Sequence, residues 1–290
     1  MAGISPILIL KCGWKSGIQA YRAHSAILIR IWPGKRLLRP GNIYHAPMPP
    51  GLRLRMTCIC IDTNLFLGLY GADEDPGEIL ADIWALRERL VFPDIIFDEF
   101  FRNRSKILDR FAEDLRRREI AEVLLPSVIQ NNLNVATLQR AGEDYNRVLW
   151  TLYEDIQKVI TDPAADPIAR AFRGLTRDPA VRVFRWTEGL VARAHCRKLL
   201  GNPPKSPSTD TIGDEVIWET LLANLKEDLI FVTLDRTYHY HIAYLTEEYR
   251  EKTGGALVIT DRVSDPLKLI GREPSPALIR FESRDAKEAG

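Results

Sequence analysis

The sequence predicts an α/β fold in which helices flank a parallel β-sheet in three Rossmann-like layers. Short apolar runs alternate with longer segments of helical periodicity. The runs are apolar at successive positions, which is typical of strands buried on both faces of a parallel sheet. One long stretch, from about residue 125 to 200, has only helix-like patterns, and it indicates a helical insertion.

The first strand is expected at Thr57–Ile61, an apolar and partly β-branched run. Residues 75–78 then combine an N-cap aspartate, a first-turn proline and a capping-box glutamate, the pattern of a helix start. The helix that follows has one apolar stripe, formed by Ile79, Ile83, Leu86 and Leu90. Val91–Pro93 is long enough only for an edge strand.

The next helix is expected to start at Pro93 and to continue through the charged segment 113–122. Its predicted inward residues are Ile96, Phe100, Ile107 and Phe111. Residues 127–200 indicate further helices, interrupted by prolines. Their apolar stripes are Val148, Leu149, Leu152 and Ile156, and then Val181, Phe184, Leu190, Val191 and Leu199.

Two more buried strands are expected at Leu229–Thr233 and Ala256–Thr260. A loop at residues 201–208 precedes a helix capped by Asp210 or Thr211, whose predicted buried residues are Ile217, Leu221 and Leu225. Another helix, 244–252, separates the two strands, and a short last helix starts at Ser264. Residues 272–290 are expected to be a polar tail.

Composition limits the class of protein. The chain is 46% hydrophobic and 27% charged, as in ordinary globular domains. No apolar run approaches the roughly 18 residues of a membrane span, so no membrane partner is expected. The four cysteines (Cys12, Cys58, Cys60 and Cys196) are too few for a disulfide scaffold. They are typical of small buried side chains in a reducing compartment, which predicts a cytoplasmic protein.

Four acidic residues are expected to meet at one edge of the sheet. Asp62 and Asp235 directly follow buried strands, and the carboxyl ends of parallel strands form the site of such folds. Glu99 lies early in one predicted helix, and Asp214 lies near the start of another. Two unit charges about 4 Å apart repel by roughly 4 kcal/mol at an effective dielectric constant near 20. We therefore expect a divalent cation with oxygen ligands among the four.

Other polar residues are expected to support this site. Asn64 and Thr233 lie beside the acids that follow the strands. Arg102, Asn103 and Lys106 follow Glu99 at helical spacing on one polar face. Substrate phosphates are expected to contact Arg102, Asn103, Arg104, Lys106 and Lys205. Two metal ions held by the four carboxylates would clamp a phosphodiester and activate water.

Plainer interpretations stay open for each residue taken alone. A single aspartate after a strand is most often a turn residue or a helix cap. Asp98 and Glu215 are neighbouring acids that could replace Glu99 and Asp214, and Glu219 could be merely solvated. His239 and His241 would share one face of a strand, but without a third ligand in register they do not indicate zinc.

Five segments of the chain resemble the PIN-like nucleases, specifically their longer group with a helical insertion. These segments are Ile61–Asn64, Asp98–Arg104, Gly201–Pro204, Ile212–Glu219 and Phe231–Asp235. The resemblance covers about Met56 to Gly271. Each motif is short, but all five in this order are fairly specific.

The resemblance implies an endonuclease that depends on Mg²⁺ or Mn²⁺ and acts mostly on single-stranded RNA. Its metal-binding and catalytic acids would be Asp62, Glu99, Asp214 and Asp235, and Thr233 matches the hydroxyl residue two positions before the last acid. The alternative is that the chain is a non-catalytic binding module of a toxin–antitoxin or defence pair. A phosphatase that forms an aspartyl-phosphate intermediate on Asp62 is disfavoured. Such enzymes have a second aspartate two residues later, and this chain has Asn64 there. A homodimer stays open.

Residues 1–55 differ from the rest of the chain. Residues 1–61 contain no Asp or Glu but nine Lys or Arg, whereas the net charge of the whole chain is only +1. The body is therefore acidic, so it is not a broadly basic nucleic-acid binder. We expect residues 1–55 to be an extension outside the fold and Met56–Gly290 to fold alone. The alternative is a basic arm that steers RNA toward the body.

Overall fold

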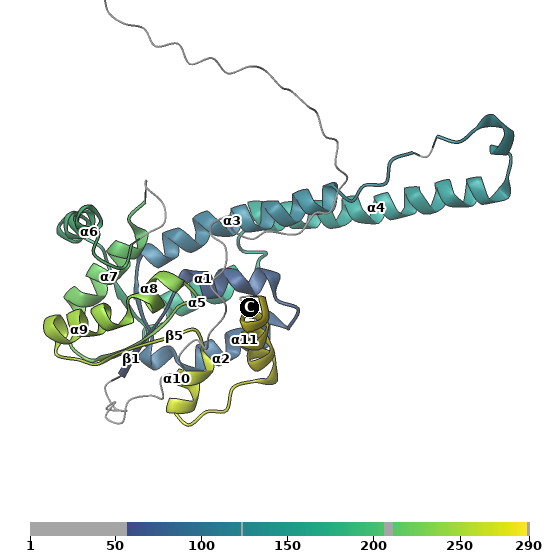
Figure 1. The fold of residues 1–290 in the computed structure, drawn as a ribbon. Helices are drawn as coiled ribbons and strands as arrows, with labels where there is room; N and C mark the ends of the chain where they lie inside the picture. The colour runs from purple at the N-terminus through teal and green to yellow at the C-terminus, as the bar shows by residue number, and fades with distance from the viewer. Residues whose placement is uncertain (1–56, 123, 206–210, 289–290) are drawn as a thin grey trace, which may run out of the picture. The chain divides into compact units, whose positions relative to one another are not determined.

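The computed structural model describes residues 57–122, 124–205 and 211–288 (Figure 1). The predicted extension 1–55 and the predicted cap Asp210 lie outside these residues. All strand pairs in the described part are parallel, and helices pack on the sheet (Figure 1). This confirms the predicted α/β class with a parallel sheet.

Three strands form the centre of the fold in the order β1-β4-β5, with β1 at Thr57–Ile61, β4 at Asp228–Val232 and β5 at Leu257–Thr260. Strands β2 (Val91–Pro93) and β3 (Arg182–Phe184) pair with each other. A parallel bridge between Ile59 and Leu90 joins β1 to the start of β2. Strand β2 therefore lies between β1 and β3 and is not the edge strand that its length suggested.

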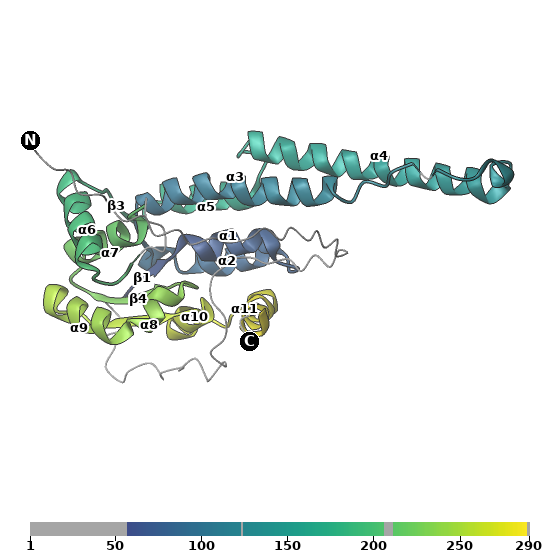
Figure 2. The same ribbon diagram turned by 45° about the horizontal axis from the view of Figure 1, so that its top comes forward.

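The helices between and after these strands have the following bounds. Before β3 they are α1 (Thr63–Gly68), α2 (Pro76–Ala85), α3 (Ile95–Arg116), α4 (Leu133–Thr161) and α5 (Pro167–Arg177), with short 3₁₀ turns η1 (Leu69–Gly71), η2 (Arg87–Arg89) and η3 (Ser127–Ile129). After β3 they are α6 (Glu188–Leu200), α7 (Gly213–Asn224), α8 (Arg236–Tyr240), α9 (Ile242–Thr253), α10 (Ser264–Leu269) and α11 (Pro276–Glu288). The ribbon views show α7 and α9 on one side of the strands and α1 and α2 on the other (Figures 1 and 2).

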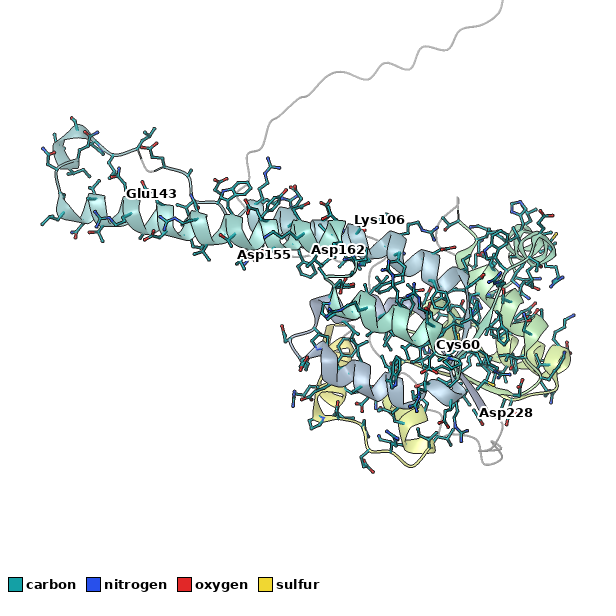
Figure 3. All side chains as sticks on the ribbon, turned by 180° about the vertical axis from the view of Figure 1, so that it is seen from behind. Cys60, Lys106, Glu143, Asp155, Asp162 and Asp228 are labelled. Carbon is teal, nitrogen blue, oxygen red and sulfur yellow. The ribbon has the colours of Figure 1, made fainter. Side chains whose placement is uncertain are left out.

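The core lies between the sheet and these helices. All five residues of β1 are buried, as expected for a strand covered on both faces. Cys58 and Cys60 are free thiols on this strand, and Figure 3 labels Cys60. Phe172 of α5 packs against Phe66 of α1 and Phe100 of α3, with ring centroids 4.6 Å and 4.4 Å apart. These contacts make α5 part of the core, although its sequence lies within the predicted insertion.

The sequence interpretation needs two corrections at the chain's later elements. The predicted polar tail contains α11, whose Ala277, Leu278 and Phe281 are buried in the same core. Apolar residues at this helical spacing form a narrow stripe that the surrounding charged residues obscure. Strand β3 was expected to be helical; it is a three-residue strand that begins with an exposed arginine.

Helix α3 buries a different face from the one expected. Ile96 and Phe100 are fully buried, as predicted, but Phe111 is exposed. The buried stripe continues through Arg104, Leu108 and Ala112, at a spacing of four residues. Helix α3 ends at Arg116, and its distal half runs side by side with α4 in Figures 1 and 2. Helix α4 therefore determines which face of distal α3 is covered.

Helices α3, α4 and α5 meet at one buried charge. Nε of Arg104 donates to Oδ2 of Asp166 over 2.6 Å, and both side chains are only 1% exposed. The guanidinium also donates to the carbonyl oxygens of Val159 and Ile160 at the end of α4. Asp166 caps α5 and accepts a further hydrogen bond from the hydroxyl of Tyr70. The ion pair thus anchors the base of the α3–α4 pair to the core.

In the part of the chain that the structure describes, no helix combines the length and apolarity needed to cross a membrane.

Candidate functional site

Asp62 is held rigidly at the carboxyl end of β1. It follows the strand directly, is 5% exposed, and its backbone N–H donates to Val232 of the neighbouring β4. Oδ1 accepts the backbone N–H of Thr63 over 2.7 Å, so the side chain also caps α1. Oδ2 accepts the hydroxyl of Thr233 over 2.6 Å. The carboxylate is therefore fixed by both neighbouring strands.

Asn64 and Thr233 connect Asp62 with the segment that carries Asp235. Nδ2 of Asn64 donates to Oδ2 of Asp62 over 2.8 Å and to Oγ1 of Thr233 over 3.2 Å. Oγ1 of Thr233 accepts the backbone N–H of Asp235 over 3.0 Å. Oδ1 of Asn64 accepts the backbone N–H of Leu234 over 3.2 Å. The two residues predicted to support the acids thus form a hydrogen-bond network that joins the ends of β1 and β4.

Asp235 and Asp214 both lie at helix N-termini. Asp235 is the N-cap of α8, and its Oδ1 accepts the N–H of Thr237 over 2.8 Å. Asp214 is the second residue of α7, where the helix dipole favours a negative charge. The hydroxyl of the fully buried Tyr238 donates to the carbonyl oxygen of Asp214 over 3.4 Å. Tyr238 therefore links the starts of these two helices.

Glu99, and not its neighbour Asp98, points toward the other acids. Asp98 is exposed, whereas Glu99 is half-buried in the second turn of α3. A Cβ atom at Gly213 would lie 3.6 Å from Oε2 of Glu99, so the carboxylate lies against the start of α7. Glu215 is fully buried and lies next to Asp214 on α7.

The four carboxylates act on one another electrostatically. Burial raises the pKa of Asp62 to about 7; the hydrogen bond from Thr233 opposes this shift, and the charges of Glu99 and Asp235 add to it. Burial also raises the pKa of Glu99 to about 6; the charges of Asp214 and Asp235 raise it further, and Arg102 lowers it. Residues from four separate elements therefore concentrate negative charge at this edge of the sheet.

The donor set suits a hard divalent cation. Four carboxylates, one hydroxyl and one amide provide oxygen ligands, and the cluster's own charge makes a cation favourable. Among the described residues, no group of three His, Cys, Asp or Glu side chains is arranged to hold a metal ion in this structure.

The residues predicted to contact phosphate fall into different environments. Arg102 and Lys106 are exposed on α3, where Figure 3 labels Lys106, and Asn103 is half-buried beside them. Lys205 is exposed after α6. The prediction that Arg104 contacts phosphate is wrong. Its side chain is buried against Asp166 and the end of α4, so its guanidinium is not available to a substrate. Within the motif around Glu99, Arg104 is therefore structural.

Several contacts at this site were not expected from the sequence. Tyr238 was missed, although its position three residues after Asp235 fits one helical turn. His239 and His241 lie in and after α8, not on a strand, and Nε2 of His239 lies 2.9 Å from the carbonyl oxygen of Thr233. Glu219 is not merely solvated, because it pairs with Arg193 and Arg197.

The comparisons with known proteins identify one family. A family model described as PIN domain matches residues 59–238, which is more than half of the chain and includes the four acids. Neither a search of curated proteins nor a search of solved structures found a significant match.

Proposed function

Because the chain belongs to the PIN domain family, whose members are of nuclease type, we propose that it is a metal-dependent endoribonuclease. Its substrate is single-stranded RNA, and its cofactor is Mg²⁺ or Mn²⁺. The reaction is hydrolysis of a phosphodiester bond. The observation that carries this proposal is the concentration of four mutually repelling carboxylates at the carboxyl edge of a parallel sheet.

In this proposal the chain's own residues have separate tasks. Asp62 and Asp235 hold the first metal ion, and Glu99 and Asp214 complete the site or hold a second ion. Thr233 and Asn64 donate hydrogen bonds that keep the carboxylate of Asp62 in one orientation. A divalent ion in such a site lowers the pKa of bound water and stabilises charge on phosphate oxygens.

The substrate is expected to approach along the polar face of α3. Arg102, Asn103 and Lys106 lie on the same helix as Glu99, within two turns of it. Arg102 is close enough to Glu99 to lower its pKa, so a phosphate at Arg102 lies near the acids. Lys205 is a further candidate for a phosphate contact. These contacts supply affinity but no sequence preference.

The two rival functions predict different properties. A binding module without catalysis would not need the acids, and substituting them would leave RNA affinity unchanged or higher because of reduced repulsion. A phosphatase would need one free carboxylate oxygen on Asp62 as nucleophile. Both oxygens already accept hydrogen bonds from the chain, Oδ1 from Thr63 and Oδ2 from Thr233 and Asn64. Because Oδ1 keeps a lone pair, these bonds do not separate a nucleophile from a metal ligand. The phosphatase is disfavoured by Asn64, which stands where such enzymes have a second aspartate.

The first test is a cleavage assay with the full chain and end-labelled oligonucleotides. Single-stranded RNA, single-stranded DNA and double-stranded RNA are each incubated with Mg²⁺, with Mn²⁺ and with EDTA. We expect internal cleavage of single-stranded RNA with either metal and none with EDTA. Cleavage undiminished by EDTA contradicts the metal dependence. Binding of RNA without cleavage under every condition supports the non-catalytic module instead.

The substitution Arg102→Ala tests the proposed substrate face. Removing one phosphate contact is expected to weaken binding of single-stranded RNA about equally for all sequences. The slope of log K against log salt should fall by about 0.7, the value for one contact to a single strand. Fluorescence anisotropy at several salt concentrations measures both quantities. Arg110→Ala is the matched control, because Arg110 is exposed on the same helix two turns farther from Glu99. Equal affinities and slopes for the two variants would remove Arg102 from the substrate face.

A further inference from the structure

Helix α4 carries an exposed apolar stripe that the proposed function does not use. Its residues follow one another at alternating spacings of three and four, the repeat of a coiled-coil seam. They are Leu138, Ala141, Tyr145, Val148 and Leu152. The four larger side chains are 53%, 42%, 60% and 49% exposed, respectively. Isolated exposed apolar residues are ordinary, but a regular seam over two heptads indicates a surface that another helix covers.

This seam is not the face that α4 uses to contact α3. The buried residues of α4 are Val135 and Leu149. The side chain of Asn146 exchanges two hydrogen bonds with the backbone of Ile120, and Nε1 of Trp150 donates to Glu119 over 3.1 Å. At 100° per residue, these four residues are centred about one third of a turn around the helix from the centre of the seam, and Leu149 is the nearest to it at about one sixth of a turn. The seam is therefore available while α3 and α4 stay paired.

We propose that the seam binds the same seam of a second copy of this chain, with the two α4 helices antiparallel across a two-fold axis. A two-fold contact presents the same surface twice, so it must be complementary to itself. The charges along α4 provide this complementarity in one register.

In that register, Val148 of each copy packs against Leu152 of the other. The two-fold axis then places Tyr145 opposite Asp155, where the phenol can donate to the carboxylate. Asp144 and Lys158, which flank the seam on the same side, come opposite each other twice, once on each side of the axis. Such flanking charges set the orientation and partner of paired helices. Asp144 and Lys158 are exposed, and each already pairs within α4, Asp144 with Arg147 and Lys158 with Asp155, both over 2.9 Å. The contacts across the axis therefore extend two surface ion pairs and do not require a buried charge to move.

The neighbouring registers are less favourable. Shifting the second copy by one heptad in either direction places the carboxylate of Asp155 against Leu138 or against Leu152. The same shifts separate Asp144 from Lys158. In these shifted registers Asp155 keeps only Lys158 of its own helix as a partner. Covering that carboxylate with an apolar side chain removes water from it without adding a new donor, so these shifts are disfavoured. Figure 3 labels Asp155 on α4, together with Glu143, which lies outside the seam.

The first test measures the mass of the full chain by sedimentation velocity. At a chain concentration of about 100 μM, a contact with micromolar Kd is largely formed, so we expect a dimer. The double variant Val148→Asp/Leu152→Asp should be a monomer with the circular dichroism spectrum of the wild type, because both side chains are exposed in the single chain. A monomeric wild type at this concentration overturns the proposal.

The second test determines the orientation and register. Asp144→Lys places two lysines opposite each other at both ends of the contact, and Lys158→Asp places two aspartates there. Each variant alone is expected to dimerise with a Kd raised by about tenfold or more. An equimolar mixture of the two variants restores both ion pairs and should form heterodimers of wild-type affinity. Glu143→Lys, which makes the same charge change one residue earlier and off the seam, should dimerise like the wild type.

Two results of the second test contradict the proposal. If Glu143→Lys weakens the dimer as much as Asp144→Lys does, net charge and not this register determines association. If the mixture of Asp144→Lys and Lys158→Asp stays as weak as each variant alone, the antiparallel pairing of α4 is wrong. Dimers that survive Val148→Asp/Leu152→Asp would place the interface elsewhere on the chain.

Discussion

Asp62→Asn is expected to reduce cleavage of single-stranded RNA at least about 100-fold, the scale of losing one catalytic group. Asparagine has nearly the same shape as aspartate, and its oxygen can still accept a hydrogen bond from Thr233 or Asn64. It removes the negative charge with which the proposed site binds a cation. Asp98→Asn, the same change at an exposed acid beside Glu99, should retain full activity. Full activity of Asp62→Asn would remove Asp62 from the metal site.

The same substitution has an expected effect on stability when no metal is present. Burial raises the pKa of Asp62 in the folded chain to about 7, well above its value in the unfolded chain. The folded state then retains a proton that the unfolded state has lost, so this contribution to stability falls as pH rises from about 4 to 7. In EDTA, the melting temperature of Asp62→Asn should therefore exceed that of the wild type by more at pH 8 than at pH 5. A difference that does not grow with pH would contradict the buried charge at Asp62.

Arg104→Met is expected to destabilise the fold more than any other single change considered for α3. Methionine retains much of the apolar volume but leaves Asp166 buried without its cation. Breaking a buried ion pair in this way costs about 3–5 kcal/mol. The carbonyl oxygens of Val159 and Ile160 also lose their donor. Urea unfolding measures the loss, and Arg110→Met, at an exposed position on the same helix, should change stability by less than about 0.5 kcal/mol.

A double variant distinguishes this ion pair from general packing. Arg104→Met/Asp166→Asn removes both charges, and the asparagine can still cap α5 at Ile168. We expect the double variant to be more stable than Arg104→Met alone, because no uncompensated charge remains buried. If the double variant is less stable than the wild type by the sum of the losses of Arg104→Met and Asp166→Asn, the two residues act independently and the ion pair does not anchor α3 to α5.

The elements that were predicted correctly are those in which the residues of the element itself show an apolar pattern. Strands β1, β4 and β5 are largely continuous apolar runs. Short runs of this kind are typical of strands that are buried on both faces of a parallel sheet. Strand β3 was missed because three residues with an exposed arginine carry almost no pattern. Helix α11 was missed because its buried stripe lies within a segment that reads as polar overall.

The candidate site shows the same limit. The positions of Asp62 and Asp235 follow from the ends of two recognisable strands, so their meeting could be predicted. Whether Asp98 or Glu99 faces the site depends on the rotation of α3, which tertiary packing determines. Arg104 was assigned to the surface because a buried arginine is recognised only through its partner, and Asp166 is 62 residues away in sequence. Sequence patterns therefore located the acids but did not separate substrate contacts from structural ones.

The position of β1 in the sheet has a consequence for the newly synthesised chain. Asp62 at the end of β1 contacts Thr233 at the end of β4, and 171 residues separate them in sequence. At about 5–20 residues per second, β1 emerges from the ribosome roughly 10–35 s before its central partner. During that interval an apolar strand with two cysteines has an unpaired edge toward β4. The helices encoded between the two strands depend mainly on local contacts and form early. Helices cover the faces of a strand and not its edge, so the edge of β1 stays open until β4 is synthesised.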